Sequence, residues 1–161
     1  MPLVWSLRQS LPSDAPWIAE LRAQVMRPDL ERLGRWDPVR VRQRFLAGFH
    51  PAHTFVIDVD ASAAGSIAVR PESDEQWIEH FYLAPEYQGQ GLGSAVLRHV
   101  MMTQRDHRPF RLNVLQGSPA RRLYERNGFV QEHEDPIDVF LIAETDRKVL
   151  PGSTSRASQQ Q

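Results

Sequence analysis

The chain has 161 residues, of which 41% are hydrophobic and 24% are charged, a balance typical of one folded domain rather than a disordered chain. Its net charge of -1 provides no global positive field, which argues against a nucleic acid or an anionic membrane as partner. The chain has no cysteine, so disulfides, thiolate metal sites and a cysteine nucleophile are excluded.

The ends of the chain and its apolar runs bear on the expected location and domain bounds. Residues 1–5 lack the basic segment and the apolar run of a signal peptide, and no apolar run approaches the roughly 18 residues of a membrane span. We therefore expect a cytoplasmic protein. Residues 150–161 are polar and have no hydrophobic period, which predicts a flexible tail after one domain, residues 1–149.

The first third of the chain predicts a strand and two helices. Residues 3–7 favour a strand, and apolar residues at helical spacing then predict a helix that breaks at Pro28. A second helix begins at Asp37 and Pro38, because a carboxylate at the N-cap followed by proline in the first turn is typical of a helix start.

Strands dominate the rest. Residues 54–59, 65–69 and 76–83 read as strands, and their short polar links favour antiparallel neighbours. The hydrophobic period becomes helical over residues 91–104. A strand over 110–115, a helix between Ser118 and Gly128 and two closing strands follow. The order predicts an α/β domain with a mixed sheet.

The loop between residues 83 and 94 has the geometry of an anion site. Its glycines let the backbone approach a phosphate, and the following helix contributes a positive N-terminus. A nucleotide P-loop is excluded because Gly93 stands where its lysine is needed. A nicotinamide-dinucleotide fingerprint drawn as Gly89, Gly91 and Ser94 has no acidic residue about 20 positions later. A glycine turn that binds nothing also remains open.

Two segments resemble the GCN5-related N-acetyltransferase (GNAT) family. Residues 82–93 look like its acetyl-CoA motif, with Gln88, Gly91 and Gly93 matching Q/R-x-x-G-x-G/A, and residues 112–129 resemble its second motif. The chain departs from the family pattern at Ser118, where asparagine is usual. The resemblance implies a GNAT fold of the α/β (α+β) class: a mixed, mostly antiparallel sheet of six or seven strands flanked by about four helices.

The resemblance also implies acetyl-CoA as co-substrate. The strand before the loop is expected to splay from its neighbour after Leu115, so that pantetheine pairs with the strand backbone and the N–H of Leu83 stabilises the thioester oxyanion. The residues expected to bind the cofactor are Phe81, Tyr82, Leu83, Gln88, Gly89, Gln90, Gly91, Leu92, Gly93, Ser94, Ser118 and Arg121.

Three residues are candidates for proton transfer. Tyr124 matches the family tyrosine that protonates the departing thiolate. An amine acceptor arrives as ammonium and needs a base, and Glu79 and His80 both lie on the strand before the loop. Strict alternation would place them on opposite faces. The family more often uses glutamate there, so Glu79 is preferred and His80 is the alternative.

The resemblance implies direct transfer of the acetyl group to a primary amine of a small molecule, peptide or protein, and it allows a homodimer. Acidic residues near the expected acceptor site would attract a cationic amine; they are Asp29, Glu31, Asp135 and Asp138. No metal is expected, because His50 and His53 lack a third ligand. The alternatives are a CoA-binding sensor without transfer chemistry and a nicotinamide-dinucleotide-binding oxidoreductase.

Overall fold

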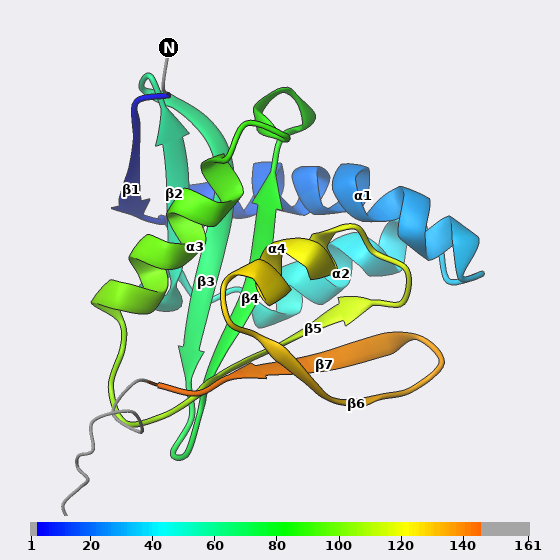
Figure 1. Ribbon diagram of the computed structural model, residues 1–161. Coiled ribbons are helices and arrows are strands. Elements are labelled where there is room, and N and C mark those ends of the chain that lie inside the picture. The colour runs from blue at the N-terminus through cyan, green and yellow to red at the C-terminus, as the bar shows by residue number, and fades with distance from the viewer. Residues whose placement is uncertain (1–2, 146–161) are drawn as a thin grey trace, which may run out of the picture.

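The computed structural model describes residues 3–145, which form one seven-stranded sheet with helices on both faces (Figure 1). The strands are β1 (Trp5–Gln9), β2 (Thr54–Val59), β3 (Ser62–Pro71), β4 (Gln76–Leu83), β5 (Phe110–Leu115), β6 (Val130–Glu134) and β7 (Asp138–Ala143). The helices are α1 (Ala15–Arg32), α2 (Pro38–Gly48), α3 (Leu92–Thr103) and α4 (Ala120–Arg126). The predicted tail, 150–161, and the domain end at residue 149 lie outside the described residues.

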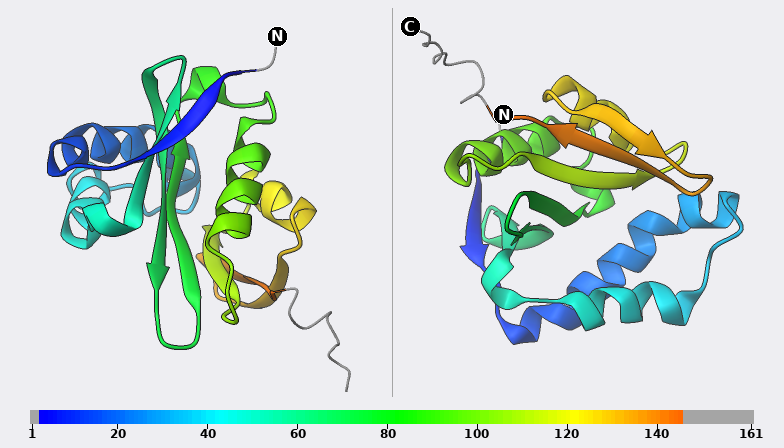
Figure 2. Two further views of the ribbon diagram at one scale, coloured as in Figure 1. Left: turned by 90° about the vertical axis from the view of Figure 1, so that its left-hand side faces the viewer. Right: turned by 90° about the horizontal axis from the view of Figure 1, so that it is seen from below.

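The strands are ordered β1-β2-β3-β4-β5-β7-β6, and among the described strands only β4 and β5 pair in parallel. Helices α1 and α2 cover one face of the sheet, while α3 and α4 cover the other (Figure 2). Each face has its own buried cluster, with Val96 and Leu97 of α3 on one side and Ile18 and Phe45 on the other. The mixed, mostly antiparallel sheet confirms the predicted architecture.

Local signals placed most elements correctly. The strands β2, β4 and β5 have the predicted bounds. The Asp37 side chain caps α2 as expected, accepting hydrogen bonds from the N–H groups of Val39 and Arg40 at 3.0 Å. The predicted break at Pro28 is wrong, because α1 continues to Arg32. Proline removes one helical hydrogen bond, but Pro28 is exposed, so water can satisfy the carbonyl that is left free.

Within residues 3–145, no helix combines the length and the apolar character that a membrane crossing requires.

Strands β4 and β5 separate soon after they begin. Their parallel pairing is limited to Gln76 with Phe110 and Trp77 with Arg111. On its other edge, β5 pairs with β7 along its whole length. The divergence that we expected after Leu115 therefore starts near the beginning of both strands. This earlier separation leaves the β5-facing edge of β4 without a neighbouring strand from Ile78 onward.

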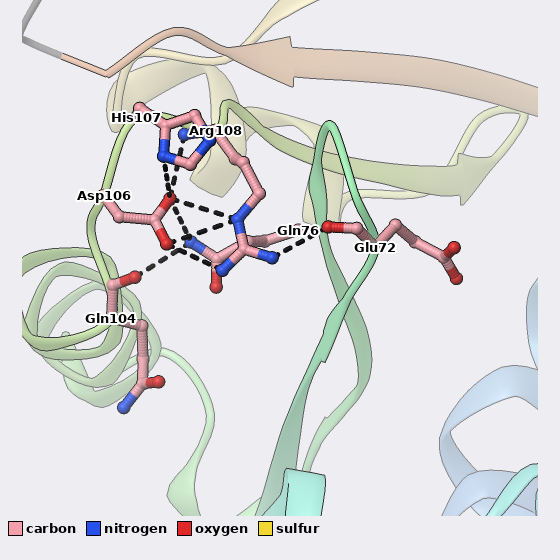
Figure 3. Close-up of polar contacts among 6 residues, drawn as sticks. All are labelled: Glu72, Gln76, Gln104, Asp106, His107 and Arg108. Atoms are coloured by element: carbon pink, nitrogen blue, oxygen red, sulfur yellow. Dashed lines mark hydrogen bonds and ion pairs between the residues drawn. The ribbon is translucent and has the colours of Figure 1, made fainter.

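The closed end of this divergence is held by polar contacts (Figure 3). The buried Gln76 side chain at the start of β4 donates to the carbonyl of Gln104 at 2.9 Å. Arg108, just before β5, forms an ion pair with Asp106 at 2.6 Å and donates to the Glu72 carbonyl at 2.7 Å. These contacts fix the ends where β4 and β5 pair, so the strands open only in the other direction.

A bulge in β4 changes which side chains share a face. Ser66 pairs with Tyr82 and Ala68 with Glu79, so the single residue between them on β3 opposes both His80 and Phe81. His80 adopts a φ of +49°, a left-handed conformation that is uncommon for residues other than glycine. Strict alternation is therefore lost, and the prediction that Glu79 and His80 lie on opposite faces is wrong.

The contacts of β4 show the result. Ile78, Phe81 and Leu83 pack in the cluster on the α3 side. The His80 ring instead packs edge-on against Phe45 of α2, with centroids 5.0 Å apart, and Tyr82 lies in the cluster on the α1 and α2 side. The bulge therefore brings His80 and Tyr82 to the face where Glu79 already lies.

Candidate active site

A cleft of about 1390 Å³ opens where β4 and β5 diverge. Its walls come from five parts of the chain: the α1–α2 region, β4, the glycine loop, the end of β5 with α4, and the link between β6 and β7. The side chain of Arg32, at the end of α1, donates to the carbonyl of Gln116 after β5, so α1 reaches across to the opposite wall. The separated strands thus form a site between two groups of helices.

The glycine loop enters this cleft and ends in α3. Gly89 and Gly91 have φ values of +73° and +83°, which glycine adopts without the steric cost of a Cβ atom. Gly91 is also the N-cap residue of α3. The free N–H groups and the positive dipole end of this helix therefore face the cleft, a geometry that binds phosphate groups.

The other loop residues divide between the cleft and the protein interior. Gln88, Gly89, Gly91, Gly93 and Ser94 line the cleft. Leu92 is buried in the core, and the Gln90 side chain donates to the carbonyl of Glu86 at 2.7 Å. Leu92 and Gln90 therefore support the loop, and a ligand in the cleft would meet the first five residues.

The edge of β4 presents a free backbone donor to the gap. The N–H of Ala84 donates to the carbonyl of Ala64 on β3 at 2.8 Å. Because N–H groups alternate between the two edges of a strand, the N–H of Leu83 points to the opposite edge, where β5 has separated. The Leu83 carbonyl accepts a hydrogen bond from the Gln88 side chain at 2.8 Å, which ties the loop to the strand end.

Tyr124 of α4 lines the cleft across from β4. Its ring packs against Phe81 and Phe129, with centroids 6.4 and 5.7 Å away, and only 7% of the residue is exposed. Burial raises the pKa of the Tyr124 phenol, so the hydroxyl is protonated at neutral pH. Within residues 3–145 no hydrogen-bond partner occupies this hydroxyl, so it is available to a ligand.

Glu79 is held by an arginine of the neighbouring strand. Both of its carboxylate oxygens accept hydrogen bonds from Arg70, at 2.9 and 3.0 Å. The side chains are 31% and 34% exposed, so the pair is in contact with solvent. Arg70 also pairs with Glu72 and lies 5.8 Å from the centre of the Trp77 ring. Glu79 thus has a fixed orientation at the edge of the cleft.

His80 belongs to a buried polar chain that reaches α1. Its Nδ1 lies 3.0 Å from the Tyr82 hydroxyl, and that hydroxyl accepts a hydrogen bond from Arg22 at 2.5 Å. Burial, followed by the charge of Arg22, lowers the pKa of His80 to about 4. The imidazole is therefore neutral at pH 7 and is a weak base.

The low pKa of His80 predicts a stability change in mild acid. Its unfolded-state value is about 6.5, so the neutral ring contributes its full stabilisation above that pH and loses it as the pH falls toward 4. The difference corresponds to about 3 kcal/mol of unfolding free energy. Denaturant titrations between pH 7 and 4.5 should show this loss. His80→Asn, which suits the left-handed backbone, should show a smaller loss. Equal pH slopes for both proteins would contradict the assignment.

Comparison with protein families identifies the family of the chain. The chain matches the model of the acetyltransferase (GNAT) domain over residues 50–131, a span that contains β4, the glycine loop and α4. The chain belongs to the GNAT acetyltransferase family. The predicted resemblance is thereby confirmed. No curated protein matches the sequence at a significant level.

Solved structures show the same GNAT fold at low sequence identity. The PaiA N-acetyltransferase from Thermoplasma acidophilum, solved in complex with coenzyme A, is 17% identical, with a TM-score of 0.68 over 88% of this chain and 99% of that chain. The ribosomal-protein-S18-alanine N-acetyltransferase from Escherichia coli is 18% identical, with a TM-score of 0.66 over 88% and 94%. An acetyltransferase from Thermus thermophilus is 16% identical, with a TM-score of 0.69 over 89% and 98%.

Two further predicted cofactor residues have different surroundings in this GNAT domain. Ser118 lies in the cleft wall, and its hydroxyl accepts a hydrogen bond from the N–H of Ala120, the first residue of α4, at 3.2 Å. The N-cap residue is Pro119, one position later than expected. The Arg121 guanidinium instead bonds to Glu125 and Gln131, at 3.0 and 2.8 Å. Arg126, which sequence reasoning missed, is the arginine of α4 that lines the cleft.

The acceptor was expected to bind at the end of the cleft formed by the α1–α2 region and the β6–β7 link. This end was predicted to be acidic, but it also carries arginines. Asp29, Asp135 and Asp138 line the cleft as expected, whereas Glu31 pairs with Arg27 on the surface. Arg35, in the polar segment expected to contact the acceptor, also lines the cleft. Sequence reasoning missed Arg22, Arg40 and Arg44, which line it as well. Helical spacing on α2 was the available signal for Arg40 and Arg44, which lie one turn apart.

The described part of the chain, residues 3–145, bears on the predicted absence of a metal site. No group of three or more potential metal ligands gathers in this part of the chain. The His50 and His53 rings lie 5.6 Å apart, and neither residue lines the cleft.

Proposed function

We propose that this protein transfers an acetyl group from acetyl-CoA to a primary amine by direct attack in a ternary complex. The observation that carries the proposal is the convergence, in one cleft, of the unpaired edge of β4, the glycine loop at the start of α3, and the Tyr124 hydroxyl. The family of the chain supports an acetyl donor, and three kinds of group in the cleft suit the parts of acetyl-CoA.

The cleft residues fit acetyl-CoA as a substrate. The backbone N–H groups from Gly89 to Ser94 suit its pyrophosphate, because several donors and a helix dipole point the same way. The free edge of β4 suits the amide groups of pantetheine, which can pair with a strand as a peptide does. The N–H of Leu83 suits the thioester oxygen, where negative charge develops during attack.

The reaction needs a proton acceptor near the amine. Glu79 stays the preferred base, because His80 has a pKa of about 4 and its Nδ1 already contacts Tyr82. The carboxylate of Glu79 is partly exposed, so a water molecule can carry the proton from the ammonium group. Its pairing with Arg70 holds the carboxylate in place during this transfer.

The chemistry balances without a covalent enzyme intermediate. The amine nitrogen forms a bond to the acetyl carbonyl carbon, and the carbon–sulfur bond of the thioester breaks. The amine starts as ammonium and loses two protons. One passes to solvent through Glu79 before attack; the second leaves the nitrogen as the tetrahedral intermediate collapses and replaces, by way of solvent, the proton that Tyr124 gives to the departing thiolate. The products are an N-acetyl amide and the free thiol of CoA.

Release of CoA thiol tests the proposal directly. The protein is incubated with acetyl-CoA and a panel of primary amines, the free thiol is followed with a chromogenic disulfide, and the acetylated amine is identified by mass spectrometry. We expect amine-dependent thiol release for at least one amine. Glu79→Gln should lower kcat by about 100-fold for that amine, the scale of a general base, and His80→Asn should have a smaller effect.

A CoA-binding module without transfer chemistry is a second candidate. The observation that favours it is that Glu79 is occupied by Arg70 and that His80 is a weak base. This candidate predicts that acetyl-CoA binds tightly while no amine produces thiol release. The nicotinamide alternative has no such support, because the family of the chain is an acetyltransferase family.

Domain extent, cellular location and oligomeric state complete the proposal. We infer one catalytic domain over residues 1–149, supported by the single sheet of the described residues. A cytoplasmic location is tested by cell fractionation, and a homodimer by light scattering of the purified protein.

A further inference from the structure

The end of the cleft formed by the α1–α2 region carries arginines that pair with no carboxylate of residues 3–145. Arg40 and Arg44 lie one turn apart on α2, are exposed and line the cleft. Neither forms an ion pair with a carboxylate of residues 3–145, and the same holds for Arg35. Arg42, on the same helix, pairs with Glu20 at 2.7 Å and lies outside the cleft lining.

The carboxylates that line the cleft accept their contacts from other groups, and within residues 3–145 none of them pairs with Arg35, Arg40 or Arg44. Asp37 and Asp135 accept from backbone N–H groups. The remaining contacts are Asp29 with Arg32, Glu79 with Arg70, and Asp138 with the amide of Asn113. Asp37, Asp135 and Asp138 keep their negative charge, but carboxylates only accept hydrogen bonds, so the groups that can donate to an anionic ligand at this end are the guanidinium groups.

Arg22 links this basic end to the proposed reaction centre. Its Nε donates to the carbonyl of Val41 at 2.9 Å, and its Nη1 donates to the Tyr82 hydroxyl next to His80. The guanidinium is thus fixed between α2 and β4. Like charges one turn apart, such as Arg40 and Arg44, disfavour a helix unless an anion lies between them.

We propose that the acceptor is the amine of an acidic amino acid, whose side-chain carboxylate Arg40 and Arg44 bind while the amino group lies toward Glu79. This inference rests on the proposed acetyl transfer and narrows its acceptor to acidic amino acids. It reverses the expectation of a cationic acceptor. Guanidinium groups bind carboxylates through paired hydrogen bonds, so an acidic amino acid fits this end of the cleft. The acid is either free or at the N-terminus of a peptide.

Matched acceptor pairs test the charge requirement. The value of kcat/KM is measured for L-glutamate against L-glutamine, L-aspartate against L-asparagine, a Glu-Ala-Ala peptide against its Gln-Ala-Ala counterpart, and for spermidine. We expect kcat/KM to be about tenfold or more higher for the acidic member of each pair, because the amide member lacks the carboxylate that makes the charge-assisted contact. Comparison of the free amino acids with the peptides shows whether the acceptor is a free acidic amino acid or an acidic residue at a peptide N-terminus.

Variants then assign the preference to the arginines. In the R40Q/R44Q double variant the preference for acidic acceptors should disappear, through a rise in KM. Arg42→Gln is the matched control, since it removes a charge from the same helix outside the cleft, and it should retain the preference. Glutarate, which has two carboxylates and no amine, should raise the Tm of the CoA-saturated wild type and leave that of the double variant unchanged.

The outcomes separate this inference from the proposed function. Equal or better turnover of glutamine, asparagine or spermidine would overturn the inference and leave acetyl transfer intact. If no amine releases thiol, acetyl transfer fails and the glutarate titration decides alone. A Tm shift that depends on Arg40 and Arg44 would then support an anion site, whereas the absence of a shift in the wild type would overturn it.

Discussion

Tyr124→Phe is expected to lower kcat by about 100-fold and to leave the KM for acetyl-CoA within about threefold. The change removes only the hydroxyl, which lines the cleft and has no hydrogen-bond partner within residues 3–145. The ring contacts with Phe81 and Phe129 are retained, so the fold and the binding of the substrate should survive. The measurement is steady-state thiol release with an acceptor from the amine panel.

Tyr87→Phe is the matched control for this loss. Tyr87 lies near the glycine loop and packs on the same cluster, but it lies outside the cleft lining. It should keep wild-type kcat. An unchanged kcat in Tyr124→Phe would show that the phenol does not protonate the thiolate. Burial keeps this phenol protonated but also makes it a weaker acid, so the size of the loss reports how far the leaving group needs its proton.

Gly65→Ala is expected to cost about 3 kcal/mol of unfolding free energy, at the upper end of the usual range for overpacking. An added Cβ at Gly65 would lie 2.1 Å from the backbone oxygen of Tyr82, so a strand must move. For a domain of this size, the cost corresponds to a fall in Tm of about 6 to 12 °C. Because the clash lies between β3 and β4, and β4 forms one wall of the cleft, the affinity for acetyl-CoA should fall as well.

Gly48→Ala gives the matched glycine control. Gly48 ends α2, and an added Cβ there would meet nothing within 4 Å. Its Tm should stay within about 3 °C of the wild type, since helix propensity favours alanine by only about 1 kcal/mol. A Gly65→Ala protein with wild-type Tm would mean that β3 and β4 are less closely packed than the structure indicates.

The elements that sequence patterns placed correctly are those set by local signals. The bounds of β2, β4 and β5 follow from runs of β-type residues between turn residues, and the start of α2 follows from Asp37. The position of the glycine loop between β4 and α3 was also predictable, because the change from a strand period to a helical period lies at that point.

The features that patterns missed depend on neighbours far along the chain. The bulge at His80 exists because β3 offers one residue against two of β4, which alternation within β4 cannot reveal. The early separation of β4 and β5 reflects the complete pairing of β5 with β7. Likewise, Arg40 and Arg42 look equivalent in the sequence, but Glu20 of α1 pairs with Arg42 alone.

A thermal-shift titration with acetyl-CoA, CoA and NAD tests the central claim most directly. At 100 times its Kd, a ligand that binds the folded state adds about 2.7 kcal/mol, which corresponds to a rise in Tm of about 5 to 11 °C here. The account predicts such a rise with acetyl-CoA and with CoA and none with NAD. The assignment of the cleft to acetyl-CoA would be contradicted if neither acetyl-CoA nor CoA raised the Tm, or if NAD raised it more than they do.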